Sequence, residues 1–223
     1  MWPGFQFFPI RASTAAGQVD ALFLFMLAVS VFFAGLIFVL VTIFAIKYRR
    51  RAEGETPEPI LGSLKLELAW TIIPLGIALV MFGWGAWLYF SLSSPPGDAI
   101  EIFVVGKQWM WKLQHPDGRR EINELHVPVG RPVKLTMTSE DVIHSFFVPA
   151  FRIKKDVVPG RYTTAWFQAT KTGEYRLYCT QYCGTSHAEM TGKVVVMEAS
   201  QYESWLRGSA TESPVAAGGR LFQ

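Results

Sequence analysis

Two long runs without a charged residue place the strongest constraint on what this chain can fold into. They cover residues 21–46 and 68–92. As an α-helix the first run would be roughly 39 Å long, more than the ~30 Å hydrocarbon core of a bilayer requires. Helices buried in globular proteins seldom stay uncharged for more than about 18 residues. The sequence therefore predicts a hairpin of two transmembrane helices within residues 20–97.

The connection between the two runs indicates their orientation. Its basic residues are Lys47, Arg49, Arg50, Arg51 and Lys65. Short basic loops stay on the cytoplasmic side of the membrane. A cleaved signal peptide does not explain the first run, because the run is too long and no basic segment precedes it. We therefore expect a multi-pass protein of the cell inner membrane, with both termini and the region after residue 97 on the periplasmic side.

Beyond the second run the hydrophobic period changes from helical to alternating. In residues 131–139, Val133, Leu135 and Met137 point to one side and the residues between them to the other. Similar stretches, separated by turn signals, lie at residues 99–106, 121–127, 161–168, 173–179 and 192–198. Six or more short strands predict an all-β sandwich or Greek-key barrel over residues 98–208.

The ends of the chain and its net charge say little about its function or partners. Residues 1–19 are expected to be an exposed lead-in, and residues 209–223 have the composition of a linker. Ser200 and Glu203 fit a capping box that would begin a short helix at residues 200–208. From residue 98 onward the chain has 15 Lys and Arg against 13 Asp and Glu, which is too balanced to indicate a charged partner. No nucleic-acid partner is expected.

The segment "YCTQYCGTSHAEM", residues 178–190, contains the only two cysteines of the chain. Cys179, Cys183, His187 and Met190 could surround one point if the segment is a loop. Two cysteines in an exported domain often form a disulfide. A disulfide, however, has no need of a histidine and a methionine at this spacing, whereas thiolate, imidazole and thioether together suit copper.

Copper sites of this kind usually take a second imidazole from another loop. His144 is the best candidate, because it follows a predicted strand and a sandwich could bring its loop to the same end as Cys179. Taken alone, His144 could also be a core histidine. His115, in a predicted turn, and His126, in a predicted strand, are expected to be ordinary surface or packing residues.

With these residues the chain resembles subunit II of haem-copper cytochrome c oxidase. The resemblance rests on "HSFFVPAFRIKKDVVPGR", on the cysteine segment and on the two preceding helices. It implies a cupredoxin domain with a dinuclear CuA centre, in which both copper ions are bridged by Cys179 and Cys183. His144 and His187 would be terminal ligands, Met190 a weak thioether ligand, and the backbone carbonyl of Gln181 the last donor.

The resemblance also implies a function and partners. The chain would accept electrons from cytochrome c, whether soluble, tethered or fused, and pass them to the haem of subunit I, which reduces oxygen to water. In "GKQWMW" Trp109 would be the point where the electron enters, and in "ELAWTIIP" Glu67 would lie at the mouth of a proton channel. Relatives usually have Glu where this chain has Gln181, and that Glu helps to hold magnesium. Magnesium at the interface with subunit I is therefore doubtful here.

Several alternatives compete with this interpretation. Packing in the sandwich explains most aromatic residues in strands, Trp109 included. Glu67 could be an acid at the end of a helix. The chain could also be a membrane-tethered protein for copper storage or delivery, although such sites are typically open. A quinol oxidase subunit II would lack the cysteines, and nitrous oxide reductase needs a large second domain.

Overall fold

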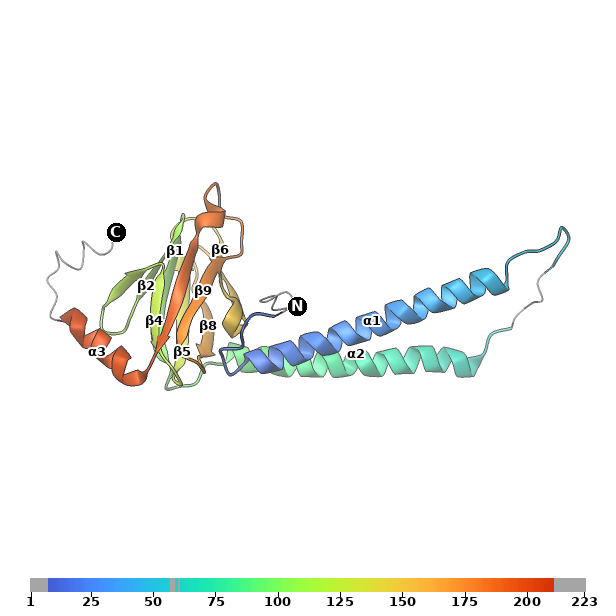
Figure 1. Ribbon diagram of the computed structural model, residues 1–223, viewed down its shortest axis with the longest axis horizontal. Helices are drawn as coiled ribbons and strands as arrows, with labels where there is room; N and C mark the ends of the chain where they lie inside the picture. The colour runs from blue at the N-terminus through green and yellow to red at the C-terminus, as the bar shows by residue number, and fades with distance from the viewer. Residues whose placement is uncertain (1–7, 57–58, 60, 211–223) are drawn as a thin grey trace, which may run out of the picture. The chain divides into compact units, whose positions relative to one another are not determined.

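The computed structural model describes residues 8–56, 59 and 61–210 and divides into two compact units. One unit consists of residues 20–88, and the other combines residues 1–19 with residues 89–223. The predicted tail at 209–223 and the first seven residues of the predicted lead-in lie largely outside the described residues. Figure 1 shows a helical hairpin in the first unit and a β-sandwich in the second.

The helical unit is built from α1 (Ala16–Lys47) and α2 (Leu64–Ser93). The helices run antiparallel and side by side (Figure 1), with the rings of Phe25 and Trp84 5.9 Å apart. Their apolar windows have mean hydropathies of 2.9 and 1.9, and none of those residues is buried within the chain. Since such surfaces are stable only against lipid or other apolar helices, the predicted transmembrane spans are confirmed, and each helix extends a few residues further.

The β-domain consists of two five-stranded sheets packed face to face (Figure 1). The first sheet has the order β3 (Arg120–Ile122), β2 (Met110–Gln114), β1 (Ile100–Lys107), β5 (Pro132–Ser139) and β8 (Thr163–Gln168). The second has the order β4 (Glu124–Pro128), β10 (Thr191–Met197), β9 (Gly173–Cys179), β6 (His144–Val148) and β7 (Ile153–Val157). Alternate residues point inward, so the two sheets enclose one apolar core. The predicted all-β sandwich is confirmed.

One predicted strand, residues 121–127, proves to be two strands in different sheets. The chain changes sheet at Asn123, which has a φ of 58° between β3 and β4. Asparagine tolerates this left-handed conformation better than most residues. Its side-chain oxygen accepts a hydrogen bond from the backbone N–H of Trp111 at 2.8 Å, which fixes the corner.

The predicted exposed lead-in is wrong for the residues closest to the first helix. Ala12, Ser13 and Ala16 are buried. The backbone N–H of Ala12 donates to the carbonyl of Ala150, and its carbonyl accepts from the N–H of Thr170. The Ser13 hydroxyl donates to the carbonyl of Phe151 at 2.8 Å. This segment therefore adds a short extended piece to the edge of the β-domain, where small side chains allow close approach.

The C-terminal helix is α3 (Ala199–Ala210), and its cap lies two residues before the predicted one. Ser200 lies inside the helix, so it cannot cap it. Instead the side chain of Gln201 accepts a hydrogen bond from the backbone N–H of Glu198, at 3.3 Å. This is the glutamine half of a capping box, shifted two residues toward the N-terminus. Two short 3-10 helices complete the domain, η1 (Pro149–Phe151) and η2 (His187–Glu189).

Candidate metal centre

Three neighbouring strands bring the predicted donors to one end of the sandwich. β6 begins at His144, and β9 ends at Cys179. These strands pair antiparallel, with Phe146 opposite Cys179. After the loop of residues 180–190 the chain returns as β10, and the backbone N–H of Cys179 donates to the carbonyl of Met190 at 3.1 Å. The loop therefore closes on itself beside the start of β6.

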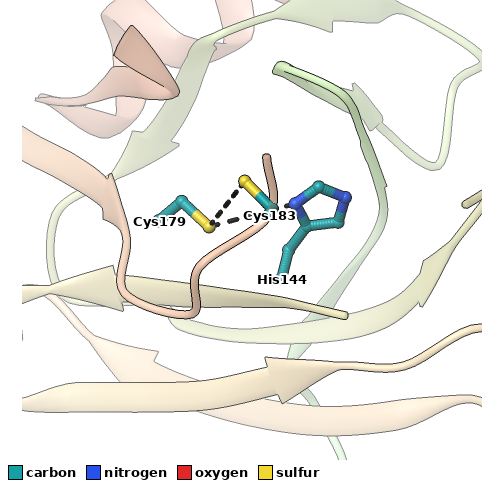
Figure 2. A group of neighbouring side chains, drawn as sticks. All are labelled: His144, Cys179 and Cys183. Carbon is teal, nitrogen blue, oxygen red and sulfur yellow. Dashed lines mark hydrogen bonds between the residues drawn. The ribbon is translucent and has the colours of Figure 1, made fainter. Parts of the chain in front are cut away.

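The two cysteines face each other without being bonded. Figure 2 shows their sulfur atoms side by side, with the His144 ring directed toward them. The Sγ atoms are 3.9 Å apart, almost twice the ~2.05 Å of a disulfide bond. His144 Nδ1 lies 3.9 Å from the Sγ of Cys179. In the structure both cysteines are free thiols, and the disulfide alternative is absent from it.

The remaining predicted donors lie around the same pair of sulfurs. His187 Nδ1 is 3.4 Å and Met190 Sδ 3.8 Å from the Sγ of Cys183. The carbonyl oxygen of Gln181 is 3.3 Å from the Sγ of Cys179. Each sulfur thus has one imidazole nitrogen and one weaker donor beside it. All the predicted donors therefore gather around the two sulfurs.

Burial and chemistry both fit a soft metal. His144 and Met190 are fully buried, Cys179 and Cys183 are buried, and His187 is half-buried. Burial, together with the neighbouring Cys179, raises the pKa of Cys183 to about 12, so the metal-free thiol keeps its proton. A metal ion must displace that proton and then provides the positive charge that the buried thiolate lacks. Thiolates, imidazoles and a thioether are the donors that copper prefers.

A residue that the sequence reasoning missed, Asp141, orients one of the ligands. Its Oδ1 lies 2.8 Å from His144 Nε2. This bond places the imidazole hydrogen on Nε2 and leaves Nδ1, on the side of the sulfurs, free to bind metal. Burial alone would raise the pKa of Asp141, but hydrogen bonds from Gln108, His144 and Val142 outweigh it and lower the pKa to about 2. The carboxylate therefore stays charged at neutral pH.

The loop after β1 holds the two ligand segments together. The backbone N–H of Gln108 donates to Asp141 at 2.8 Å, and its side-chain amide donates to the carbonyl of Cys183 at 2.7 Å. Gly106, on β1, makes room for the His144 ring, since a Cβ there would lie 2.8 Å from the ring carbon Cδ2. The spacing of Asp141 three residues before His144 was the only signal in the sequence that pointed to this support.

Trp109 lies directly against the cluster. Its indole N–H donates to the carbonyl of Cys183 at 3.1 Å, and the ring is half-buried. Gly184, with a φ of +116°, faces this ring, and a Cβ there would lie 3.2 Å from ring carbon Cζ2. Trp109 therefore packs against the core, as the packing interpretation expects, and is also hydrogen-bonded to the backbone of a cysteine.

The other candidate residues lie apart from the donors. Glu67 is exposed in the first turn of α2, where an acid also stabilises the helix N-terminus. Gln181 is exposed, whereas its backbone carbonyl oxygen lies beside the Sγ of Cys179. His115 is buried and His126 nearly so, and both bind Glu121. They are packing residues as predicted, although the predicted turn does not leave His115 at the surface.

Comparison with known proteins gives a consistent match. Residues 119–199 match the family model "Cytochrome C oxidase subunit II, periplasmic domain", and residues 2–85 match "Cytochrome C oxidase subunit II, transmembrane domain". The sequence is 31% identical to alternative cytochrome c oxidase subunit 2 of Bradyrhizobium diazoefficiens, covering 81% of this chain and 76% of the relative. It is also 31% identical to cytochrome c oxidase subunit 2 of Thermostichus vulcanus, covering 89% and 77%.

The β-domain is also similar to a solved structure. The crystal structure of the periplasmic domain of subunit II of cytochrome oxidase from Bradyrhizobium japonicum superposes with a TM-score of 0.50 and 33% sequence identity. The match covers 52% of this chain and 97% of that domain. The predicted cupredoxin-like sandwich is thereby supported by a second comparison.

Proposed function

The chain belongs to the cytochrome c oxidase subunit II family and is an inner-membrane subunit of a respiratory oxidase, and we propose that its β-domain receives electrons from a c-type cytochrome. The domain then passes them to the haem of subunit I, where oxygen is reduced to water. Both termini and the β-domain lie on the periplasmic side, because the connection between the helices is basic. The functional units are the hairpin at 20–97 and the domain at 98–208.

The observation that carries the proposal is the pair of buried sulfurs, 3.9 Å apart, with one imidazole nitrogen beside each. Cys179 and Cys183 would bridge two copper ions, with His144, His187, Met190 and the carbonyl of Gln181 completing the set. Bound there, a dinuclear CuA centre would supply a one-electron couple shared by two metals.

The surrounding residues keep the geometry of the donors constant. Asp141 fixes the tautomer and the ring orientation of His144, and Gln108 fixes the carbonyl of Cys183. Ligands that are held rigidly lower the reorganisation that accompanies a change of charge, and burial excludes water from them. Trp109 offers the electron a path from the surface to Cys183, through the hydrogen bond between its indole N–H and the cysteine carbonyl.

Two further roles follow from the same family. Glu67, in the first turn of α2, stands at the mouth of a proton channel into subunit I. Magnesium binding at the interface with that subunit is weak or absent, because the neutral amide of Gln181 is a poor ligand for a hard cation. The partners of the chain are therefore subunit I, the other membrane subunits, the lipid bilayer and the cytochrome donor.

Burial argues against copper storage or delivery as the function. A delivery site must exchange its metal with a partner, so its ligands have to be accessible. Here four of the donor residues are buried, and they come from two loops that are tied together by Gln108 and Asp141. A closed and rigid site suits electron transfer, in which the metal stays and only charge moves.

An electron paramagnetic resonance spectrum of the copper-loaded full chain tests the proposal. A seven-line hyperfine pattern, with two copper ions per chain, is expected because one unpaired electron is shared by two metals. The matched control is Cys183→Ser, which removes one bridge and should abolish that pattern. A four-line spectrum of the unaltered chain, or a disulfide that persists after copper loading, would refute the dinuclear site.

A further inference from the structure

Trp111, in β2, packs directly against His144, the candidate ligand at the start of β6. Its side chain is fully buried. The two rings meet edge to face, with their centroids 6.0 Å apart and their planes at 65°. Packing in a sandwich explains most aromatic residues in strands. Here, however, the packing partner is a candidate metal ligand, so the contact can act on the site itself.

The surroundings of Trp111 leave it little freedom to move. Its backbone N–H donates to the side chain of Asn123 at 2.8 Å, and its carbonyl accepts from the N–H of Asn123 at 2.8 Å. Its ring also meets that of the buried Phe146 edge to face, at 5.2 Å. Phe146 in turn lies opposite Cys179 where β6 pairs with β9. Trp111 is therefore a rigid part of the wall around the candidate metal centre.

The hydrogen bond between His144 and Asp141 fixes only one end of the imidazole ring. It holds Nε2, at 2.8 Å from the carboxylate. The Cβ–Cγ bond, about which the ring turns, points to the far edge of the ring between Nε2 and Cε1. Rotation about this bond therefore moves Nε2 little but swings Nδ1, the atom on the side of the sulfurs. Histidine has no narrow preference for this torsion, so packing has to set it.

Two paired residues provide that packing. Trp111 lies opposite Gly106 in the pairing of β2 with β1. Because Gly106 has no side chain, the His144 ring occupies the space beside Trp111, where a Cβ would lie 2.8 Å from ring carbon Cδ2. The Nε1 atom of Trp111 has no hydrogen-bond partner among the residues that the structure describes. The indole therefore acts on His144 through its size and shape.

We propose that Trp111 is a positioning residue of the candidate metal centre, which holds His144 at the rotation that directs Nδ1 toward the metal. Asp141 determines which nitrogen carries the hydrogen, and Trp111 determines where the free nitrogen points. This inference rests on the proposed function, because it takes copper as the metal. A ligand that cannot rotate keeps its geometry when the charge of the site changes, as rapid electron transfer requires.

Trp111→Leu and Trp111→Phe in the full chain test this role. The copper affinity of Trp111→Leu, measured by competition with a chelator, should fall about tenfold or more, as it does when the support of a metal ligand is lost. Trp111→Phe keeps an aromatic ring and removes no side-chain hydrogen bond, so its loss should be smaller. The hyperfine pattern in the electron paramagnetic resonance spectrum of Trp111→Leu should also change. If Trp111→Leu does not fold, Trp111→Phe serves for the same comparison.

Phe151→Leu is the matched control. Phe151 is fully buried and packs against Phe167 and Tyr175, near the other end of β9 from Cys179. The control should lower the melting temperature of the metal-free chain about as much as Trp111→Leu, because each removes a buried aromatic ring. Its copper affinity and spectrum should match those of the unaltered chain.

The ring nitrogens of His144 provide a second measurement. Nitrogen-15 resonances of the metal-free chain report which nitrogen is protonated. Asp141→Asn should change this pattern, whereas Trp111→Leu should leave the hydrogen on Nε2, since the hydrogen bond to Asp141 remains. A change of tautomer in Trp111→Leu would overturn the proposal, because the effect would then pass through Asp141.

The remaining outcomes separate the two proposals. Equal copper affinities and unaltered spectra for the Trp111 variants and Phe151→Leu would overturn the positioning role. The chain would still bind two copper ions in that case, so the proposed function would stand. If the unaltered chain takes up no copper, the proposed function fails, and the positioning role fails with it.

Discussion

Trp109 and Cys183 are 74 positions apart in the sequence, yet the indole nitrogen of the first donates a hydrogen bond of 3.1 Å to the carbonyl oxygen of the second. The amide of Gln108 donates to the same oxygen at 2.7 Å. One cysteine carbonyl thus receives two side-chain donors from a single turn. The aromatic ring is coupled to the site through a residue that is itself a candidate ligand.

Replacing Trp109 with phenylalanine should slow the arrival of electrons and leave the metal site intact. A smaller aromatic ring is retained, but the hydrogen bond to the Cys183 carbonyl is lost while that from Gln108 remains. We expect the rate of electron transfer from the bound cytochrome to fall at least about tenfold, equivalent to ~1.4 kcal/mol in the barrier. Flash-initiated electron transfer measures this rate, and Trp166→Phe provides a control in β8. An unchanged rate would show that the electron enters elsewhere.

Asp141→Asn should weaken copper binding. The neutral amide cannot stabilise the His144 imidazole as the carboxylate does, and it can present an N–H where an acceptor is required. Loss of such a supporting carboxylate typically lowers metal affinity about 10- to 100-fold. Competition with a copper chelator measures the affinity. Glu140→Gln is the control, since Glu140 is the neighbouring acid but does not touch a candidate ligand, and equal affinities for the two variants would contradict the role of Asp141.

Glu121 should make the β-domain sensitive to acid. Burial alone would raise its pKa, but hydrogen bonds from His115 and His126 outweigh burial and hold the pKa below the ordinary value of 4.5. Protonation is therefore easier in the unfolded chain, so Glu121 stabilises the fold above about pH 4.5, and this stabilisation is lost as the pH falls through the lower folded-state pKa.

Thermal unfolding of the copper-free chain between about pH 3 and 7 tests this dependence. Glu121→Gln should be destabilised by about 1–3 kcal/mol near neutral pH, since it disrupts two buried hydrogen bonds. Its melting temperature should then fall less than that of the unaltered chain on acidification. Glu174→Gln, at an exposed position in β9, should follow the unaltered chain. Parallel pH curves for all three proteins would exclude Glu121 as the acid-sensitive group.

Trp205 should be the main anchor of α3. The Arg119 guanidinium lies 3.4 Å from the centre of its ring, and the His126 ring stacks on it at 4.5 Å. Trp205→Ala removes this stacking and part of the apolar contact, and we expect a loss of about 2 kcal/mol in the free energy of unfolding. Faster amide exchange confined to residues 199–210 should accompany the loss. Glu203→Ala, on the exposed side of the same helix, should change neither quantity, and equal effects of the two substitutions would argue against the anchor.

Most of the architecture could be predicted from the sequence because it is encoded locally. The uncharged runs define the transmembrane helices, and alternation defines most strands, since both patterns repeat within a few residues. The strand break at Asn123 and the docking of residues 12–16 onto the β-domain were not predicted, because neither feature is encoded locally. Each depends on a partner far away in the chain, the backbone of Trp111 in one case and Ala150 in the other.

The candidate metal centre could likewise be predicted only in part from the sequence. By itself, the sequence determined which donors are available and that five of them lie within or beside one short segment. Tertiary structure alone decided that the sulfurs of Cys179 and Cys183 stand 3.9 Å apart, and that Asp141 and Gln108 bind the two ligand loops together. The reason is physical: residue type fixes which metal a side chain can bind, but distances between loops arise only when the sheets pack and their strands come into register.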